Sequence, residues 1–406
     1  MIPPGRNVIG YTDRSPFMTL FPFSLRRRAA PPEAKASRTQ ALVALLGGAR
    51  AQWTPRDYGA LAREGYQRNA IAYRCVRMIA QGVGELVPLL SEDGRENAVH
   101  PLLELLAQPN ARLSGPGLME ALAAHLLLSG NAYVEAVSLG ASPRELHVLR
   151  PDRMRVVAGA DGWAQAYDYT AGGRSVRFVQ EGGAGAPPPI LHVALFNPLD
   201  DHYGAPPLEA AQMALDLHNA AGAWNKALLD NAARPSGALI YGGAGNLSDE
   251  QFERLKEELE ANFSGSGNAG RPLLLEGGLD WRPLSLTPHD MDFLEAKNAA
   301  AREIALAFGV PPMLLGIPGD ATYANYAEAS RVLWRQTILP LGRRLLHELS
   351  LWLSPAYGPG RLVLEPDLDA IEVLHGEREA LWRRVNEASF LTEDEKRQAV
   401  GYGVRG

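Results

Sequence analysis

The stretch 301–329, AREIALAFGVPPMLLGIPGDATYANYAEA, constrains the fold of this chain more than any other. A long helix of small residues meets Pro311 and Pro312 there, and two consecutive prolines cannot continue a helix. An apolar triplet, two glycines and a polar segment with two tyrosines follow. The segment holds no pairing of a nucleophile with a base and no metal cluster. We therefore expect a helix that ends in a projecting loop with a mechanical role.

Length and composition predict a segmented cytoplasmic protein. The chain has 406 residues and a mass of 43.9 kDa, which exceeds one typical domain and predicts two or three packed units. Its 41 glycines and 30 prolines indicate many turns rather than a repeat array. The single cysteine, Cys75, excludes an internal disulfide framework and a cysteine-based zinc site. Its setting, AIAYRCVRMIA, favours a packed helical position over a reactive thiol.

The charge balance limits how the chain can meet nucleic acid. A net charge of −6 argues against a protein that holds DNA by neutralising many phosphates, because such proteins have an excess of Lys and Arg. The charge is compatible with a protein past which nucleic acid slides. No apolar run reaches the ~18 residues that span a bilayer, so we expect no membrane segment. Prolines and charged residues near the N-terminus exclude a signal peptide.

The first half of the chain is predicted to change from helices to strands. Residues 1–52 mix Pro, Ala and Ser with a basic run and predict a disordered N-terminal arm, within which Met18 is an alternative start. Helices are expected over 66–86 and 101–107, and from Ser114 to a stop at Gly130. Six strand-like runs then follow up to residue 197, separated by Asp-Gly and Gly-Gly turns, and predict an antiparallel meander.

Two long helices are predicted around a small insertion. The first begins at the prolines 206–207 and continues to about residue 233, and its many alanines and few charges indicate contact with other protein. The second begins at a capping box at Thr287. Spacings of three and four along it form a seam typical of packing against near-parallel neighbours. That packing fits contacts within one subunit and between subunits equally well. The seam residues are Met291, Leu294, Asn298, Ala301, Ala305 and Phe308.

The insertion, residues 236–286, is predicted to combine strands with one helix. The helix begins at a capping box formed by Ser248 and Gln251. Its charged face reads most simply as a solvated surface with ion pairs. The residues of that face are Glu250, Arg254, Glu257 and Glu258.

The segment after the loop is predicted to be mostly helical. A helix over 328–353 contains Pro340, which predicts a kink or break near residues 338–339. The run RLVLEPD predicts a strand, and two helices complete the chain. The last helix begins at a capping box, Thr392 with Glu395. Because strands and helices occupy separate stretches, the fold class is predicted to be α+β.

Sequence motifs for an enzyme are missing. No P-loop, dinucleotide-binding, zinc-protease or nucleophile-elbow motif occurs. Asp200, Asp201 and His202 form a contiguous triplet that is typical of a solvated turn. His125 lies on an apolar helical stripe without a partner at metal spacing, which favours a core position. Asp290 lies at a helix N-terminus, where the dipole favours carboxylates. We therefore predict no catalytic residue, metal or cofactor.

The order of these parts resembles the portal proteins of tailed bacteriophages and, most of all, those of phage-derived gene transfer agents. The resemblance extends from about residue 56 to the C-terminus and includes the blocks ALLDNAARPSGALIY, NAGRPLLLEGGLDW and GVPPMLLGIPGDATYANYAEA. It implies an α+β portal subunit with a strand-rich wing and a short helical crown. The implied parts are the wing (53–205), stem helix 1 (206–235), clip (236–286), stem helix 2 (287–309), tunnel loop (310–327), kinked helix between wing and crown (328–353) and crown (354–406).

In that family the subunits form a ring, usually of twelve, at one capsid vertex, and double-stranded DNA passes through it. The resemblance implies that the polar tunnel loop touches this DNA but attracts its phosphates only weakly. Alternatively, its two tyrosines pack against the neighbouring subunit. The implied channel residues are Leu315, Gly316, Gly319, Asp320, Thr322, Tyr323, Asn325 and Tyr326.

The resemblance also implies partners and a location. The charged face of the clip would bind the large terminase during packaging and a head–tail adaptor protein afterwards, and the ring would sit among copies of the major capsid protein. The protein would belong to a virion or a gene transfer agent particle. Two other functions stay open: another head–tail connector ring, and an enzyme whose site combines distant residues such as Asp200, His202 and Asp290.

Overall fold

A computed structural model provides the structure of the chain. The described residues belong to one compact unit, Trp53–Gly406. The expected disordered arm, residues 1–52, lies outside them. The structure describes residues 54, 57–181, 185–230, 237–241, 248, 250, 251, 253, 254, 257, 279–283, 293–318 and 323–404.

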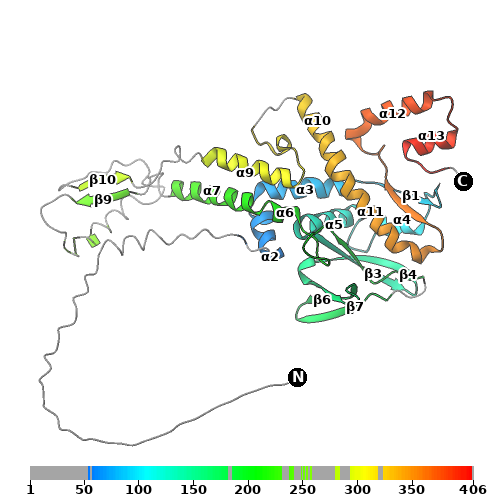
Figure 1. The fold of residues 1–406 in the computed structure, drawn as a ribbon, viewed down its shortest axis with the longest axis horizontal. Helices are drawn as coiled ribbons and strands as arrows, with labels where there is room; N and C mark the ends of the chain where they lie inside the picture. Colours follow the sequence, from blue (N-terminus) through cyan, green and yellow to red (C-terminus); the bar gives the residue numbers. More distant parts are fainter. Residues whose placement is uncertain are drawn as a thin grey trace, which may run out of the picture. The chain divides into compact units, whose positions relative to one another are not determined.

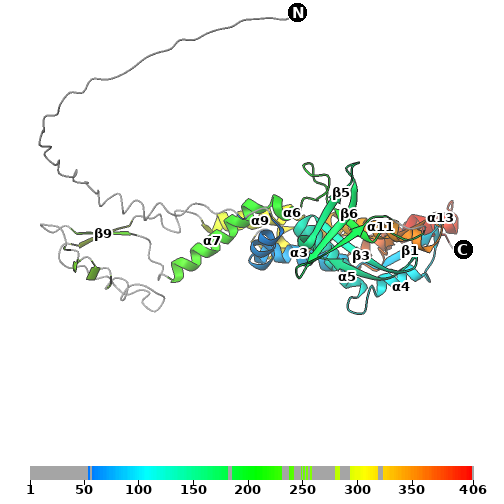
Figure 2. The same ribbon diagram turned by 90° about the horizontal axis from the view of Figure 1, so that it is seen from below.

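Two antiparallel neighbours, α3 and α5, form the centre of the core and lie side by side (Figures 1 and 2). The predicted first helix is shorter than expected because the Asn69 side chain accepts hydrogen bonds from the backbone N–H groups of the first turn and fixes its start. Ser114 caps α5, and Gly130 ends it with φ of 73°, as predicted. The helical elements of this region are α2 (Tyr58–Leu61), a π-helical turn (Ala62–Gln67), α3 (Ala70–Gly84), α4 (Pro101–Ala107) and α5 (Gly115–Ser129).

The six predicted strands form two antiparallel sheets instead of one meander. One sheet has the order β4-β3-β8 and the other the order β5-β6-β7. The predicted meander was wrong in two places, because β4 and β5 lie in different sheets and β8 pairs with β3 instead of β7. The strand β8 is mostly buried and pairs with the buried half of β3, whereas β7 is almost fully exposed. The strands are β3 (Asn131–Leu139), β4 (Ser142–Leu149), β5 (Met154–Ala158), β6 (Ala164–Ala171), β7 (Arg174–Val179) and β8 (Ile190–Ala194), with a 3-10 turn at Pro151–Arg153.

A third sheet joins the two ends of the compact unit. Its order is β11-β1-β2, with Leu90 opposite Leu364. The predicted C-terminal strand therefore pairs with a strand about 270 residues earlier, a separation that no local pattern reveals. The capping box at Thr392 is present as predicted. The elements are β1 (Pro88–Glu92), β2 (Arg95–Glu96), β11 (Leu362–Pro366), α12 (His375–Glu387) and α13 (Glu393–Val400), with 3-10 turns at Ser354–Tyr357 and Glu372–Leu374.

The first predicted long helix is interrupted near its start. It consists of α6 (Pro207–Ala210) and α7 (Gln212–Asp230), with Ala211 between them. Neither starting proline can donate a backbone hydrogen bond, so the first turn is held by the tighter bond from Glu209 N–H to the Pro206 carbonyl. The second long helix is α9 (Phe293–Ala307), and its predicted start at Thr287 lies outside the described residues.

The helix after the loop is interrupted where Pro340 predicted it. A π-helical segment (Trp334–Ile338) joins α10 (Tyr323–Leu333) to α11 (Leu339–Leu353). Proline has no N–H and its ring collides with the carbonyl four residues earlier, so the preceding turn widens. The expected helix start at residue 328 was wrong, because α10 begins five residues earlier. The segment YANYAEAS contains no glycine or proline that would stop a helix.

Candidate functional site

The two long helices, α7 and α9, pack side by side, and the predicted seam lies partly between them and the rest of the subunit (Figure 1). Ala301, Ala305 and Phe308 are buried in the subunit's own core. Asn298 is half-buried, whereas Leu294 is 71% exposed. Met291 lies outside the described residues. The C-terminal half of the seam therefore packs within one subunit.

Asn69 fastens α7 to the core. Its side-chain Oδ1 accepts from the N–H groups of Ile71 and Ala72, both at 3.0 Å, and caps α3. Its Nδ2 donates to Nδ1 of His218 at 3.0 Å and to Oδ1 of Asn219 at 2.9 Å. An amide nitrogen only donates, so His218 Nδ1 is the acceptor and its ring is neutral. Burial, and then the charge of nearby Lys297, lowers the pKa of His218, which favours that neutral form.

The beginning of the predicted loop is tied to the helices on both sides. Thr337 Oγ1 donates to the Gly309 carbonyl at 2.8 Å, and Gly309 has a φ of 67° that favours glycine. Arg302, on α9, donates from Nη2 to the carbonyl oxygen of Pro318. Between these ties the chain forms a 3-10 turn (Pro312–Leu315) that ends at Gly316 in the left-handed region. The base of the loop is therefore anchored by hydrogen bonds at Gly309 and at Pro318.

The predicted channel residues fall into three groups. Leu315 is half-buried and packs against the core, and Gly316 is exposed. Tyr323, Asn325 and Tyr326 belong to the first turn of α10, so assigning them to a loop was wrong. Asn325 is exposed, and Tyr326 is 53% exposed. The others, Gly319, Asp320 and Thr322, lie outside the described residues.

The described part of the insertion agrees with the strand and cap predictions. β9 (Gly237–Tyr241) pairs antiparallel with β10 (Leu279–Pro283). Ser248 N–H donates to Gln251 Oε1 at 3.0 Å, and Gln251 N–H donates to Ser248 Oγ at 3.3 Å, which completes the reciprocal cap. The helical residues Glu250, Arg254 and Glu257 are exposed, and Glu258 lies outside the described residues.

Of the residues considered for an enzyme site, those that the structure describes have structural surroundings. Asp200 Oδ1 accepts from the N–H groups of His202 and Tyr203, at 2.8 and 3.0 Å, and closes an exposed turn. Burial lowers the pKa of His125 to about 4, and its ring is half-buried on α5. Its enclosed Nδ1 has no hydrogen-bond partner among the described residues, so the expected packed position is present without the expected polar partner. Asp290 lies outside the described residues. Within the described ranges, no three His, Cys, Asp or Glu side chains gather in a way that would hold a metal ion.

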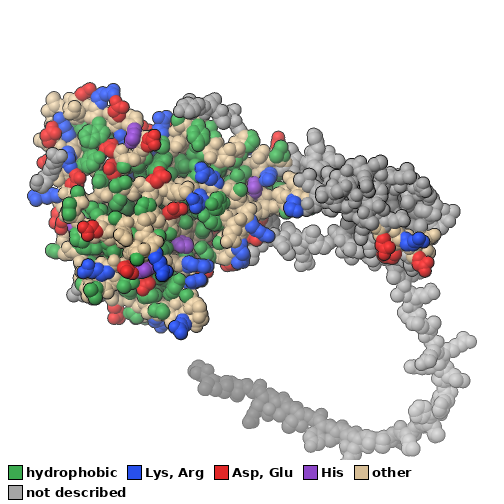
Figure 3. Space-filling model, turned by 180° about the vertical axis from the view of Figure 1, so that it is seen from behind, with side chains coloured by type: hydrophobic (Ala, Val, Ile, Leu, Met, Phe, Trp, Pro, Cys, Tyr) green, Lys and Arg blue, Asp and Glu red, His purple; other side chains and the backbone are tan. Residues whose placement is uncertain are grey.

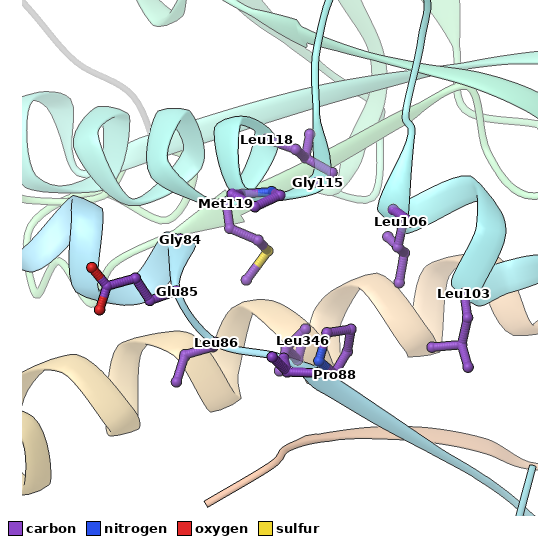
Figure 4. A pocket seen from close by; sticks show the side chains of 13 residues that line it. Gly84, Glu85, Leu86, Pro88, Leu103, Leu106, Gly115, Leu118, Met119 and Leu346 are labelled. Carbon is purple, nitrogen blue, oxygen red and sulfur yellow. The ribbon is translucent and has the colours of Figure 1, made fainter. Parts of the chain in front are cut away.

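An apolar pocket of about 410 Å³ lies between the end of α3, α4, the start of α5 and α11 (Figure 4). Leu103, Leu118, Met119 and Leu346 are among its lining residues. Of the lining residues, only Glu85 is ionisable, and Figure 4 shows it pointing away from the apolar side chains. A pocket of this kind can receive an apolar side chain but provides no pair of groups for acid–base chemistry.

The described surface is mixed in charge. On the face seen in Figure 3, Lys and Arg side chains are scattered among apolar and acidic ones. Several basic side chains near the kinked helix are paired with acids: Arg331 with Glu328, and Arg335 with Glu377 at 3.4 Å. None of the helices in the described ranges has the length and apolarity that crossing a bilayer requires.

Sequence reasoning missed the two residues that tie this region together, Asn69 and Arg302. An Asn directly before a helical run is an N-cap signal, so the capping role of Asn69 was visible in RNAIAY. Its bonds to α7 were not visible, because their partners lie about 150 residues away. Nothing in the sequence indicated that Arg302 bonds to Pro318.

Comparisons with known proteins agree with this arrangement. A family model described as phage portal protein matches residues 70–401. A chain in the neck of an empty gene transfer agent particle, computed with C6 symmetry, has a TM-score of 0.67 and 53% identity, covering 89% of this chain and 98% of that chain. Its counterpart in the neck of a native particle, computed with C12 symmetry, has a TM-score of 0.64, 53% identity and the same coverage.

A phage protein extends the likeness. The probable portal protein of Streptomyces phage phiC31 is 31% identical over 294 residues, covering 66% of this chain and 62% of that protein. The predicted α+β fold class and portal function are confirmed at the level of the family, whose rings at one capsid vertex conduct DNA. The match to residues 70–401 also outweighs the alternative of a shorter head–tail connector. Because this family model matches most of the chain, the chain belongs to the phage portal protein family.

Proposed function

We propose that twelve copies of this chain form the portal ring of a gene transfer agent or phage particle. The observation that carries the proposal is 53% identity across 89% of the chain to a subunit from a particle neck computed with C12 symmetry. Within the ring, residues 53–205 would be the wing, α6–α7 and α9 the stem, 236–286 the clip and 354–406 the crown. Electron microscopy of the purified protein tests this, and annular particles are expected.

The loop and the first turn of α10 would face the DNA. DNA carries one negative charge per ~1.7 Å of its axis, so each basic side chain on the channel wall attracts it. A ring multiplies every side chain by the number of subunits, so one arginine per subunit would add a full ring of positive charge. The exposed residues Asn325, Tyr326 and Ala327 are neutral. Their neutrality would let the duplex advance with little electrostatic resistance.

Substitution of Tyr326 tests this placement. Tyr326→Arg adds one positive charge per subunit at a 53% exposed position, and Tyr326→Gln is the neutral control. We expect both variants to form rings, and the arginine variant alone to package less DNA per particle, by ~10-fold, because it creates a ring of phosphate contacts. Equal packaging by the two variants would show that this turn does not line the channel.

The charged face of the clip would bind the large terminase and later a head–tail adaptor, and the wing would contact the major capsid protein. What supports the first assignment is the exposure of Glu250 and Glu257 on the helical part of the insertion. The double change Glu250→Lys with Glu257→Lys is expected to weaken terminase binding while rings persist. Asp201→Lys, an exposed acid outside the insertion, is the control. Unchanged terminase binding by the double variant would refute the clip assignment.

The chain would perform no catalytic step of its own. Its sequence carries no P-loop, so ATP hydrolysis would belong to the terminase motor. The portal would contribute geometry: a channel wall, a loop whose base is anchored by hydrogen bonds, and a docking surface. A purified ring that hydrolysed ATP without terminase would overturn this part of the proposal.

A further inference from the structure

One face of α7 presents a stripe of apolar side chains to solvent. Met213, Leu217, Ala220 and Trp224 follow each other at spacings of four, three and four, which places them on one helical face. Met213 is 69% exposed, Leu217 48% and Trp224 40%. The buried residues of α7, such as Leu215, lie on the other side of the helix. An apolar stripe that points away from the subunit core marks a surface for another protein.

One face of α9 repeats the same spacing. Glu295, Ala299, Arg302 and Leu306 are all exposed and also follow at four, three and four. Leu306 is 79% exposed. The buried residues of α9, such as Ile304, again lie on the opposite side. Each helix therefore buries one face within its own subunit, and side chains on its other face are exposed within the part of the chain that the structure describes.

The chain runs outward along α7 and returns along α9, so the two helices are antiparallel neighbours (Figures 1 and 2). Because each stripe faces away from the side on which its helix is buried, the stripes are two different surfaces of one subunit. A contact between two different surfaces is the kind that closes into a ring when it repeats. A second copy beside the first would then bring its α9 stripe against the α7 stripe of its neighbour.

We propose that the α7 stripe of one copy packs against the α9 stripe of the next, in one antiparallel register. The inference rests on the proposed ring and names the residues that close it. The matching spacings align four positions at once, and a shift by one residue would break all four. The pairs are Met213 with Leu306, Leu217 with Arg302, Ala220 with Ala299, and Trp224 with Glu295 of the adjacent copy.

The chemistry of the pairs suits this register. Two alanines meet at the centre, where small side chains let helix axes approach to about 8 Å. Two large apolar side chains, Met213 and Leu306, meet at the end nearest the core. The aliphatic part of Arg302 can cover Leu217 while its guanidinium stays on the Pro318 carbonyl. The contact between copies would thus include the residue that ties down the base of the loop.

Disulfide trapping in the full-length protein tests the register. The variant M213C/L306C should give a ladder of covalent oligomers on a non-reducing denaturing gel. The matched control, M213C/E295C, places cysteines on the same two faces but about 11 residues out of register, roughly 16 Å, beyond the ~7 Å that a disulfide spans. The native Cys75 is fully buried, and burial raises its thiol pKa to about 12, so it will not compete.

The outcomes separate the register from the ring itself. A ladder from M213C/L306C and none from M213C/E295C supports the register. Rings by electron microscopy with no ladder, or with equal ladders from both variants, overturn the register and leave the ring in place. Wild-type protein that forms no ring overturns the proposed function as well.

A charge exchange provides an independent measurement. Trp224→Glu places a carboxylate opposite Glu295 of the next copy, so the fraction of protein in rings should fall at least ~10-fold. Adding Glu295→Arg should restore it, because the pair becomes attractive. If the double variant assembles no better than Trp224→Glu alone, these two residues do not meet.

Discussion

Removing the Asn69 side chain should loosen α7 from the core by a predictable amount. The side chain is 1% exposed and makes four hydrogen bonds, two that cap α3 and two that reach α7. Loss of an N-cap costs about 1 kcal/mol. Each buried bond to α7 contributes about 1 kcal/mol more. Asn69→Ala is therefore expected to lower the free energy of unfolding by about 3 kcal/mol.

The variant Asn69→Asp separates the two contributions. A carboxylate still accepts from the N–H groups of the first turn but cannot donate to His218 or Asn219, so its expected cost is about 2 kcal/mol. Urea unfolding at one fixed protein concentration measures both variants, because ring assembly adds to apparent stability. The reasoning fails if Asn69→Ala costs less than about 1 kcal/mol, or if Asn69→Asp is as stable as the wild type.

Two further predictions concern acid sensitivity and a close backbone contact. Burial lowers the pKa of both His125 and His192 to about 4, below the ordinary 6.5, so unfolded chains take up protons that the folded chain cannot. The free energy of unfolding should be constant above pH 6.5 and fall by up to ~3 kcal/mol per histidine toward pH 4. The urea midpoint measured against pH checks this, and a midpoint for His125→Leu that falls as steeply as that of the wild type would contradict it. At Gly130, φ is 73° and an added Cβ would lie 2.3 Å from the Gly204 carbonyl oxygen, so Gly130→Ala should yield no soluble ring. The control is Gly172→Ala, where φ is 58° but an added Cβ meets no atom within 4 Å, so it should lower the free energy of unfolding by only about 1 kcal/mol in thermal unfolding. Equal yields of soluble ring from the two variants would refute the predicted clash between residue 130 and Gly204.

Local chemistry made several elements predictable. The caps at Ser114 and Thr392 and the stop at Gly130 depend on groups within a few residues of each other, so the sequence alone locates them. The interruption before Pro340 follows from a missing N–H and a ring that needs space. The early start of α10 was missed because the polar residues of YANYAEAS suggested a loop, although nothing in that segment prevents a helix.

Pairings across long separations were not predictable. The return of β8 to β3, and of β11 to β1, depends on which strand edges remain open once the core has formed. The seam on α9 shows the same limit. Its spacing revealed that the helix packs on something, and only burial revealed that Ala301, Ala305 and Phe308 pack within their own subunit.

The sequence alone was enough to locate the caps at Ser114 and Thr392, the helix stop at Gly130 and the double-proline stop after α9, and to show that the chain resembles a portal subunit. Those features depend on backbone geometry and on side chains close together along the chain. The tertiary structure alone decided which helical faces are covered and which stay open, because burial depends on neighbours far away in the chain. The exposed faces of α7 and α9 carry the same spacing, and only burial shows that each lies opposite the side on which its own helix is packed, which makes the two faces a candidate contact between copies.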